Sequence, residues 1–170
     1  MYKLVIIGFL AISLFFFSCK KPVEYSPVPQ ITFSKISLSD TVEAELDNPI
    51  KRIKVQFDFV DGDGDLGLNK TDTFGDFGPG KKYYYNLIFS VFEKKADKWV
   101  LNEKTKPYFR FQNISKQNTS NKVLKGYMSV DIDFLKNVGF TDTIRLDFFI
   151  YDRALHKSNV ASTPEIYLYE

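Results

Sequence analysis

The chain has 170 residues, of which 44% are hydrophobic and 26% charged, and these values exclude both a disordered chain and a multi-span membrane protein. Its formal net charge of +2 provides no strong basic field, so we predict no nucleic-acid partner. Aromatic residues make up 16% of the chain, which favours strands over helices.

The first 18 residues have the pattern of a signal peptide. A short positive stretch at residues 1–3 precedes an apolar run at residues 4–17, which is too short to span a bilayer comfortably. The only cysteine, Cys19, follows this run and Ser18 directly, and a single cysteine excludes a disulfide within the chain. The segment resembles the relaxed lipobox of Bacteroidota-type bacteria, which implies cleavage before Cys19 and its lipidation. The alternatives are an ordinary secretory signal and a short membrane anchor.

Residues 19–30 are predicted to form a flexible tether that carries the lipidated cysteine. Three prolines stand among polar residues here, a composition typical of an extended linker. In lipoproteins of the resembled type, surface export is associated with acidic residues just after the cysteine, whereas Lys20 and Lys21 occupy those places here. The resemblance therefore implies an outer-membrane lipid anchor and favours the periplasmic side over the cell surface.

Residues 31–170 are predicted to form one all-β domain. Residues 51–59 and 143–151 alternate strictly between apolar and polar side chains, which is typical of strands with one buried face. We predict further strands at residues 31–38, 83–92, 99–101, 108–111 and 123–133, with residues 159–169 closing the domain. Seven or eight strands without a long amphipathic helix predict an immunoglobulin-like antiparallel β-sandwich.

Three local features of this domain depart from regular strands. The apolar pattern changes phase between Phe33 and Ile36, which predicts a β-bulge or a switch between sheets. Residues 61–82 are rich in Gly and Asp and have no apolar period, which predicts one long loop, and loops of this length are often functional. Asp133 and Gly139 bracket a predicted single helical turn, as its N-cap and C-terminal glycine.

An acidic loop follows the strand predicted at residues 51–59. Calcium binds six to eight oxygen atoms, and alternating aspartates in a turn can direct the carboxylates of Asp61, Asp63 and Asp65 toward one point. The three match the first half of an EF-hand loop, but the required glycine is displaced and the flanks are not helices. We therefore predict a related calcium-binding loop with a structural role. The alternative is a solvated Asp-Gly turn.

Three further aspartates are candidate ligands of the same ion. Asp152 follows the strand at residues 143–151, and in an immunoglobulin-like sandwich the connection after that strand lies at the same end as the acidic loop. Asp72 and Asp76 lie within the long loop itself. The alternative for Asp152 is a turn residue that bonds its own backbone.

The segment at residues 151–160 resembles the last hairpin of bacterial immunoglobulin-like domains, in which Asp-x-Ala and Ser-Asn flank a short turn. Together with the Asp-Gly-Asp-Gly-Asp loop, it makes the chain similar to a group of uncharacterised Bacteroidota-type lipoproteins. That resemblance implies no established activity.

No catalytic pattern is present in the sequence. His156 is the only histidine and is predicted to be a solvated turn residue, and no Gly-x-Ser-x-Gly elbow occurs. We therefore predict no enzyme, but a lipid-anchored cell-envelope protein whose calcium-stabilised sandwich is a binding, adhesion or scaffold module for a protein or glycan. The alternative is a carbohydrate-binding lipoprotein of a glycan-uptake system, in which Tyr84 or Trp99 stacks on sugars.

Overall fold

The computed structural model describes residues 23–43, 45–114, 122–136 and 140–169. The predicted signal peptide and Cys19 lie outside these residues. Within them the chain forms nine strands and one short 3₁₀ helix, η2 (Gly75–Phe77). The described part of the chain contains no helix that is long and apolar enough to span a membrane.

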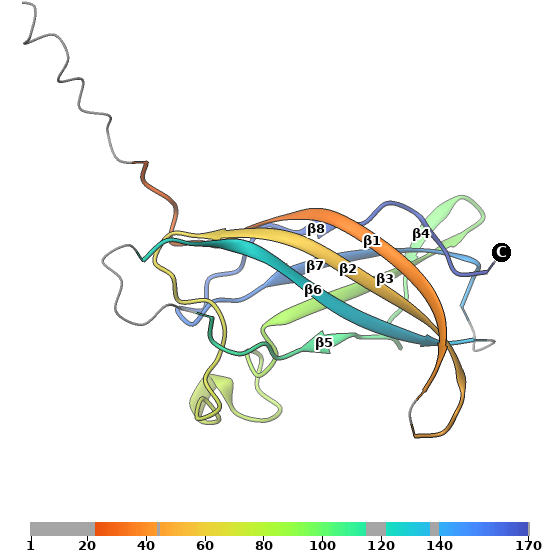
Figure 1. Ribbon diagram of the computed structural model, residues 1–170, viewed down its shortest axis with the longest axis horizontal. Coiled ribbons are helices and arrows are strands. Elements are labelled where there is room, and N and C mark those ends of the chain that lie inside the picture. Colours follow the sequence, from red (N-terminus) through yellow and green to blue (C-terminus); the bar gives the residue numbers. More distant parts are fainter. Residues whose placement is uncertain (1–22, 44, 115–121, 137–139, 170) are drawn as a thin grey trace, which may run out of the picture.

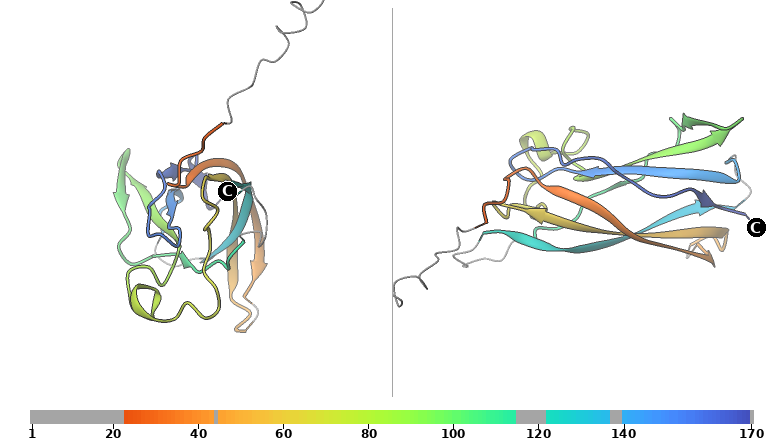
Figure 2. Two further views of the ribbon diagram at one scale, coloured as in Figure 1. Left: turned by 90° about the vertical axis from the view of Figure 1, so that its left-hand side faces the viewer. Right: turned by 90° about the horizontal axis from the view of Figure 1, so that it is seen from above.

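Two antiparallel sheets pack against each other (Figures 1 and 2). The first sheet has the order β1-β2-β6 and consists of β1 (Gln30–Val42), β2 (Pro49–Asp61) and β6 (Leu124–Leu135). In the second sheet the order is β4-β3-β7-β8, with β5 also pairing with β3 and β9 with β7. Its strands are β3 (Leu87–Lys95), β4 (Lys98–Leu101), β5 (Tyr108–Phe109), β7 (Thr143–Ile150), β8 (Ala161–Ser162) and β9 (Ile166–Tyr167).

The order β1-β2-β6 matches strands A, B and E of an immunoglobulin-like sandwich, and β3-β7-β8 matches strands C, F and G. The fourth strand differs, because β4 pairs with β3 and not with β6. The predicted all-β sandwich is therefore confirmed. In Figure 1 the end of β2, the start of β6 and the chain after β7 lie at one end of the sandwich, which brings their connections together.

The core lies between the two sheets and is built around three phenylalanines that are almost completely buried. The ring centroid of Phe148 lies 5.2 Å from that of Phe57 and 5.0 Å from that of Phe89, so the rings join β7 to β2 across the core and to β3 within the sheet. Burial of one such side chain contributes roughly 1.5–3 kcal/mol. The packed core thus holds the end of β2 in place, and the candidate site lies there.

Several sequence predictions are confirmed in detail. The side chains alternate between buried and more exposed positions from Arg52 to Asp61 of β2 and along the whole of β7. The register of β1 against β2 shifts between Phe33 and Lys35, where the change of phase predicted a bulge. The hairpin of β3 and β4 also forms as predicted.

The strand predicted at residues 83–92 begins later than expected, because β3 starts at Leu87. Asn86 is the reason for the difference. Its side-chain amide donates to the carbonyl oxygen of Phe111 (3.0 Å) and its side-chain oxygen accepts from the Phe111 N–H (2.8 Å). The Asn86 side chain thus takes up the backbone groups of Phe111 that would otherwise pair with a strand. Residues 83–86 therefore lie outside β3.

The helical turn predicted at residues 133–139 is wrong for the part that the structure describes. Residues 133–135 continue β6, while residues 137–139 lie outside the described residues. Asp133 pairs with Arg52 of β2, and the guanidinium donates to both carboxylate oxygens at 2.7 Å. Pairing with a strand distant in sequence therefore overrides the local N-cap signal.

Candidate metal centre

Asp61 is the last residue of β2 and extends the strand two residues beyond its predicted end. It is in phase with Phe57 and Phe59, so its side chain points inward, and it is completely buried. Leu124 of β6 is its partner across the sheet. The regular alternation of the strand therefore places a carboxylate at the end of the hydrophobic core.

The chain after Asp61 turns sharply, and two glycines make this turn possible. Gly64 and Gly67 have φ values of +72° and +87°, in the left-handed region that other residues rarely adopt. A Cβ atom at Gly64 would overlap the carbonyl oxygen of Lys122, and one at Gly67 would overlap that of Gln112. The close approach of two other segments thus holds the turn in place.

The turn gathers the carboxylates of Asp61, Asp63 and Asp65. One oxygen of each lies within 4.8 Å of the other two. Two oxygens that each lie about 2.4 Å from one calcium ion are separated by at most about 4.8 Å, so this spacing meets the condition for a shared ion. The arrangement predicted from the spacing of these residues therefore fits a single cation.

The same three residues carry buried oxygens without a hydrogen-bond partner. Oδ1 of Asp61, of Asp63 and of Asp65 is buried, and none of the three accepts a hydrogen bond within the described structure. Buried polar atoms are normally paired, and an uncompensated carboxylate is among the costliest groups to bury. A bound cation would compensate these buried oxygens, and protonation of a carboxylate would compensate them in part.

The electrostatics of the cluster reflect the same crowding of buried carboxylates. Burial, followed by the charges of Asp63 and Asp65, raises the pKa of Asp61 to about 7. Burial, followed by the charges of Asp152 and Asp63, also raises the pKa of Asp65. Without a cation the carboxylates repel one another, and protonation of Asp61 relieves part of that repulsion.

Asp152 reaches the cluster from the other sheet, as the sandwich topology predicted. It is 1% exposed, and burial is the main cause that raises its pKa. Both of its oxygens contact His156, because the His156 N–H donates to Oδ1 (2.7 Å) and Nδ1 lies 2.8 Å from Oδ2. The side chain of His156 is 41% exposed, in agreement with the predicted solvated turn residue, and it contacts Asp152 in addition. Direct ligation by Asp152 would compete with these bonds, so it stays a prediction.

The remaining candidates, Asp72 and Asp76, do not join the group of three. The Asp72 carboxylate forms an ion pair with the Arg153 guanidinium and accepts a hydrogen bond from the Asn69 N–H at 2.7 Å. Asp76 is exposed on the 3₁₀ helix η2. Asp72 thus neutralises the charge of Arg153 beside the site. Ligation of the ion by Asp72 or Asp76 stays a prediction.

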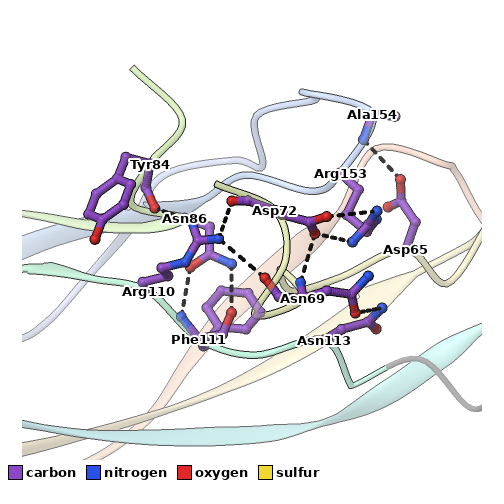
Figure 3. Close-up of polar contacts among 10 residues, drawn as sticks. All are labelled: Asp65, Asn69, Asp72, Tyr84, Asn86, Arg110, Phe111, Asn113, Arg153 and Ala154. Carbon is purple, nitrogen blue, oxygen red and sulfur yellow. Dashed lines mark hydrogen bonds and ion pairs between the residues drawn. The ribbon is translucent and has the colours of Figure 1, made fainter. Parts of the chain in front are cut away.

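Two arginines that sequence reasoning missed connect the acidic loop to the rest of the domain (Figure 3). The backbone N–H of Arg153 donates to the Asp65 carbonyl oxygen (3.3 Å), and the backbone N–H of Ala154 donates to Asp65 Oδ2 (2.9 Å). The Arg110 guanidinium donates to the carbonyl oxygens of Asp72 (2.6 Å) and Tyr84 (2.7 Å). No local pattern marks Arg110, because its partners lie 26 and 38 positions away.

The end of the predicted tether also contacts the acidic loop. The Gly62 N–H donates to the carbonyl oxygen of Ser26 at 2.9 Å, and Pro29 is buried. Lys125 of β6 places its ammonium group 3.7 Å from the centre of the Tyr25 ring. The segment that leads from Cys19 into the domain therefore passes directly beside the candidate cation site.

Comparisons of the chain with protein-family models, with curated proteins and with solved structures found no match. The function proposed for the chain therefore rests on its own residues.

Proposed function

We propose that the chain is a lipid-anchored cell-envelope protein whose β-sandwich binds one calcium ion through Asp61, Asp63 and Asp65. Two observations carry the calcium site: one carboxylate oxygen of each aspartate lies within 4.8 Å of the other two, and each aspartate has a buried Oδ1 without a hydrogen-bond partner in the described structure. A solvated Asp-Gly turn, the alternative, would expose these oxygens to water rather than bury them.

The donor set selects the kind of ion. All three grouped ligands are carboxylates, and oxygen-only sites suit hard cations such as calcium, whereas transition metals favour imidazole and thiolate groups. Sites of this kind in extracellular modules hold calcium with dissociation constants of roughly 10⁻⁴–10⁻³ M. The ion would be a structural cofactor, and we propose no catalytic role for it.

The role of the ion follows from what surrounds it. The loop at residues 62–86 contributes two ligands, the Asp65 backbone contacts the segment after β7, and the Gly62 N–H bonds the N-terminal segment. A cation that neutralises the cluster would hold these three segments together at one end of the sandwich. We infer a rigid binding, adhesion or scaffold module carried on the lipid anchor at Cys19.

The second candidate function is carbohydrate binding, and the two aromatic sites proposed for it differ. Trp99 on β4 has two cationic neighbours, with the Arg145 guanidinium carbon 5.1 Å and the Lys94 ammonium 5.9 Å from the centre of its ring. Tyr84, in contrast, lines a groove on the surface of the second sheet. The structure thus favours Tyr84 over Trp99 for this function.

Thermal unfolding of the full-length protein in detergent, with calcium and with a chelator, tests the calcium site. Calcium at a hundredfold excess over its dissociation constant should add about 2.7 kcal/mol of stability. For a domain of this size, that is a rise of roughly 5–10 °C in the midpoint. Equal midpoints in calcium and chelator would refute the site.

A further inference from the structure

A groove of about 450 Å³ opens beside the segment that precedes β3. Its volume lies within the range of sites for small molecules, roughly 300–1,000 Å³. Its walls combine aromatic and basic side chains, among them Tyr84, Tyr85, Tyr108, Tyr151, Lys81 and Lys82.

The aromatic wall of the groove presents rings to solvent. Tyr85 is 38% exposed and Tyr108 of β5 is 39% exposed, and their ring centroids lie 5.6 Å apart at an angle of 47°. Tyr84 meets Tyr85 edge to face, with its centroid 4.8 Å away. The rings therefore support one another in a fixed arrangement and leave apolar faces and phenolic hydroxyls accessible to a ligand.

The charged side chains that line the groove have one sign. Lys81 and Lys82 line it, and none of its lining residues carries a carboxylate. The Lys82 ammonium lies 4.7 Å from the centre of the Tyr83 ring and bonds its hydroxyl at 3.0 Å. A third ammonium group, that of Lys157, lies 3.9 Å above the ring of Phe149, which also lines the groove. The groove is thus complementary to a negatively charged ligand.

We propose that this groove binds a uronic acid residue of an acidic glycan. A pyranose ring has an apolar C–H face that can lie on Tyr85 or Tyr108, hydroxyls that tyrosine hydroxyls can bond, and in a uronic acid a carboxylate that Lys82 or Lys81 can pair with. The proposal names the ligand of the binding module and so rests on the proposed function.

The groove is joined to the candidate cation site through covalent and polar contacts. Tyr151 lines the groove, and Asp152 beside it in the chain reaches the acidic cluster. On the other side, Arg110 bonds the carbonyl of Tyr84 and that of Asp72, and its guanidinium carbon lies 5.2 Å from the centre of the Tyr84 ring. Calcium would therefore reduce the motion of the groove wall without moving it to a new position, and glycan affinity should fall in chelator.

Calorimetric titration of the full-length protein in detergent and calcium tests the proposal, with tetragalacturonate and tetraglucuronate as probes and their neutral, methyl-esterified forms as controls. We expect at least one uronate to bind, and its ester to bind at least about tenfold more weakly. Tyr85→Ala should weaken binding about fivefold, as expected for loss of an aromatic contact worth roughly 1 kcal/mol. Lys82→Gln should weaken it and reduce its dependence on salt. Tyr127→Ala is the matched control, because Tyr127 is 68% exposed on β6 of the other sheet.

Four results would overturn the proposal: no binding of either uronate, equal binding of the esters, equal loss in Tyr85→Ala and Tyr127→Ala, or tighter binding of a poly-glutamate peptide than of the uronates. Failure of the calcium site is measured separately, by the effect of calcium on the unfolding midpoint. Tyr85→Ala should keep the calcium-dependent rise in unfolding midpoint, whereas Asp63→Asn should lose it.

Discussion

The backbone N–H of Asp65 donates to Oδ2 of Asp61 at 3.0 Å, while Oδ1 of each residue is buried without a partner. One oxygen of Asp61 thus closes the turn, and the other stays available to a cation. The fold itself fixes the spacing of the ligands, so we expect a cation to bind without a large rearrangement of the loop. The predictions that follow test this arrangement and its surroundings.

Replacing one ligand should separate calcium binding from folding. Asp63→Asn removes one of three converging charges, so the rise in unfolding midpoint that calcium causes should disappear. The metal-free variant should be no less stable than the metal-free parent, because repulsion within the cluster decreases. Asp58→Asn, on the exposed face of β2, is the control and should keep the full calcium effect. A normal calcium response in Asp63→Asn would contradict the assignment of the ligands.

The cation-free protein should become less stable as pH rises. The pKa of Asp61 is raised to about 7 in the folded protein, so the folded state holds this proton more tightly than the unfolded chain does. The resulting stabilisation is complete below about pH 4 and is lost as pH rises to about 7. Urea unfolding in chelator should therefore show a lower free energy of unfolding at pH 8 than at pH 5. Saturating calcium should reduce this difference, and an increase of stability with pH in chelator would contradict the prediction.

The turn between the ligands should tolerate no side chain at Gly64. Gly64→Ala combines a left-handed φ of +72° with overlap of the Lys122 carbonyl, so we expect a loss of more than about 3 kcal/mol in the free energy of unfolding. Gly75→Ala is the matched control, because its φ is also positive at +57° but a Cβ would meet nothing within 4 Å. That variant should lose only about 1 kcal/mol. Equal losses in the two variants would show that the close approach to Lys122 is unimportant.

Arg110 should hold the long loop against β5. Arg110→Lys keeps the charge but loses the fork that bonds both the Asp72 and Tyr84 carbonyls, so amide hydrogen exchange at residues 69–86 should become faster. Arg52→Lys is the control, because its guanidinium bonds Asp133 on an exposed sheet face, where ion pairs contribute little. Unchanged exchange in Arg110→Lys would refute the role of this residue.

The lipid anchor predicts a simple fractionation result. Cys19→Ala removes the only cysteine, so the protein should leave the membrane fraction for the soluble fraction. Ser18→Thr keeps the cysteine and serves as the control. Full membrane retention of Cys19→Ala would favour an uncleaved signal anchor over a lipobox.

The parts of the fold that sequence predicted are those set by local periodicity. The alternation in β2 and β7, the shift near Phe33 and the convergence of Asp61, Asp63 and Asp65 all follow from patterns within short segments. The approach of Asp152 followed from sandwich topology instead, because connections after equivalent strands share one end of the domain.

The parts that sequence missed depend on contacts between distant segments. Asp133 has the local features of an N-cap, but its pairing with Arg52 keeps it in a strand. Asn86 ends an apparent strand early because its side chain bonds the backbone of Phe111, and Arg110 carries no local signal of its partners. The contact of His156 with the buried Asp152 likewise depends on the fold of the last hairpin.

Calorimetric titration of calcium into the full-length, chelator-treated protein tests the central claim most directly. We predict one calcium ion bound per chain, with a dissociation constant of roughly 10⁻⁴–10⁻³ M, and loss of this binding in Asp63→Asn but not in Asp58→Asn. Absence of calcium binding to the parent protein in this range, or equal binding by Asp63→Asn, would contradict a cation site formed by Asp61, Asp63 and Asp65.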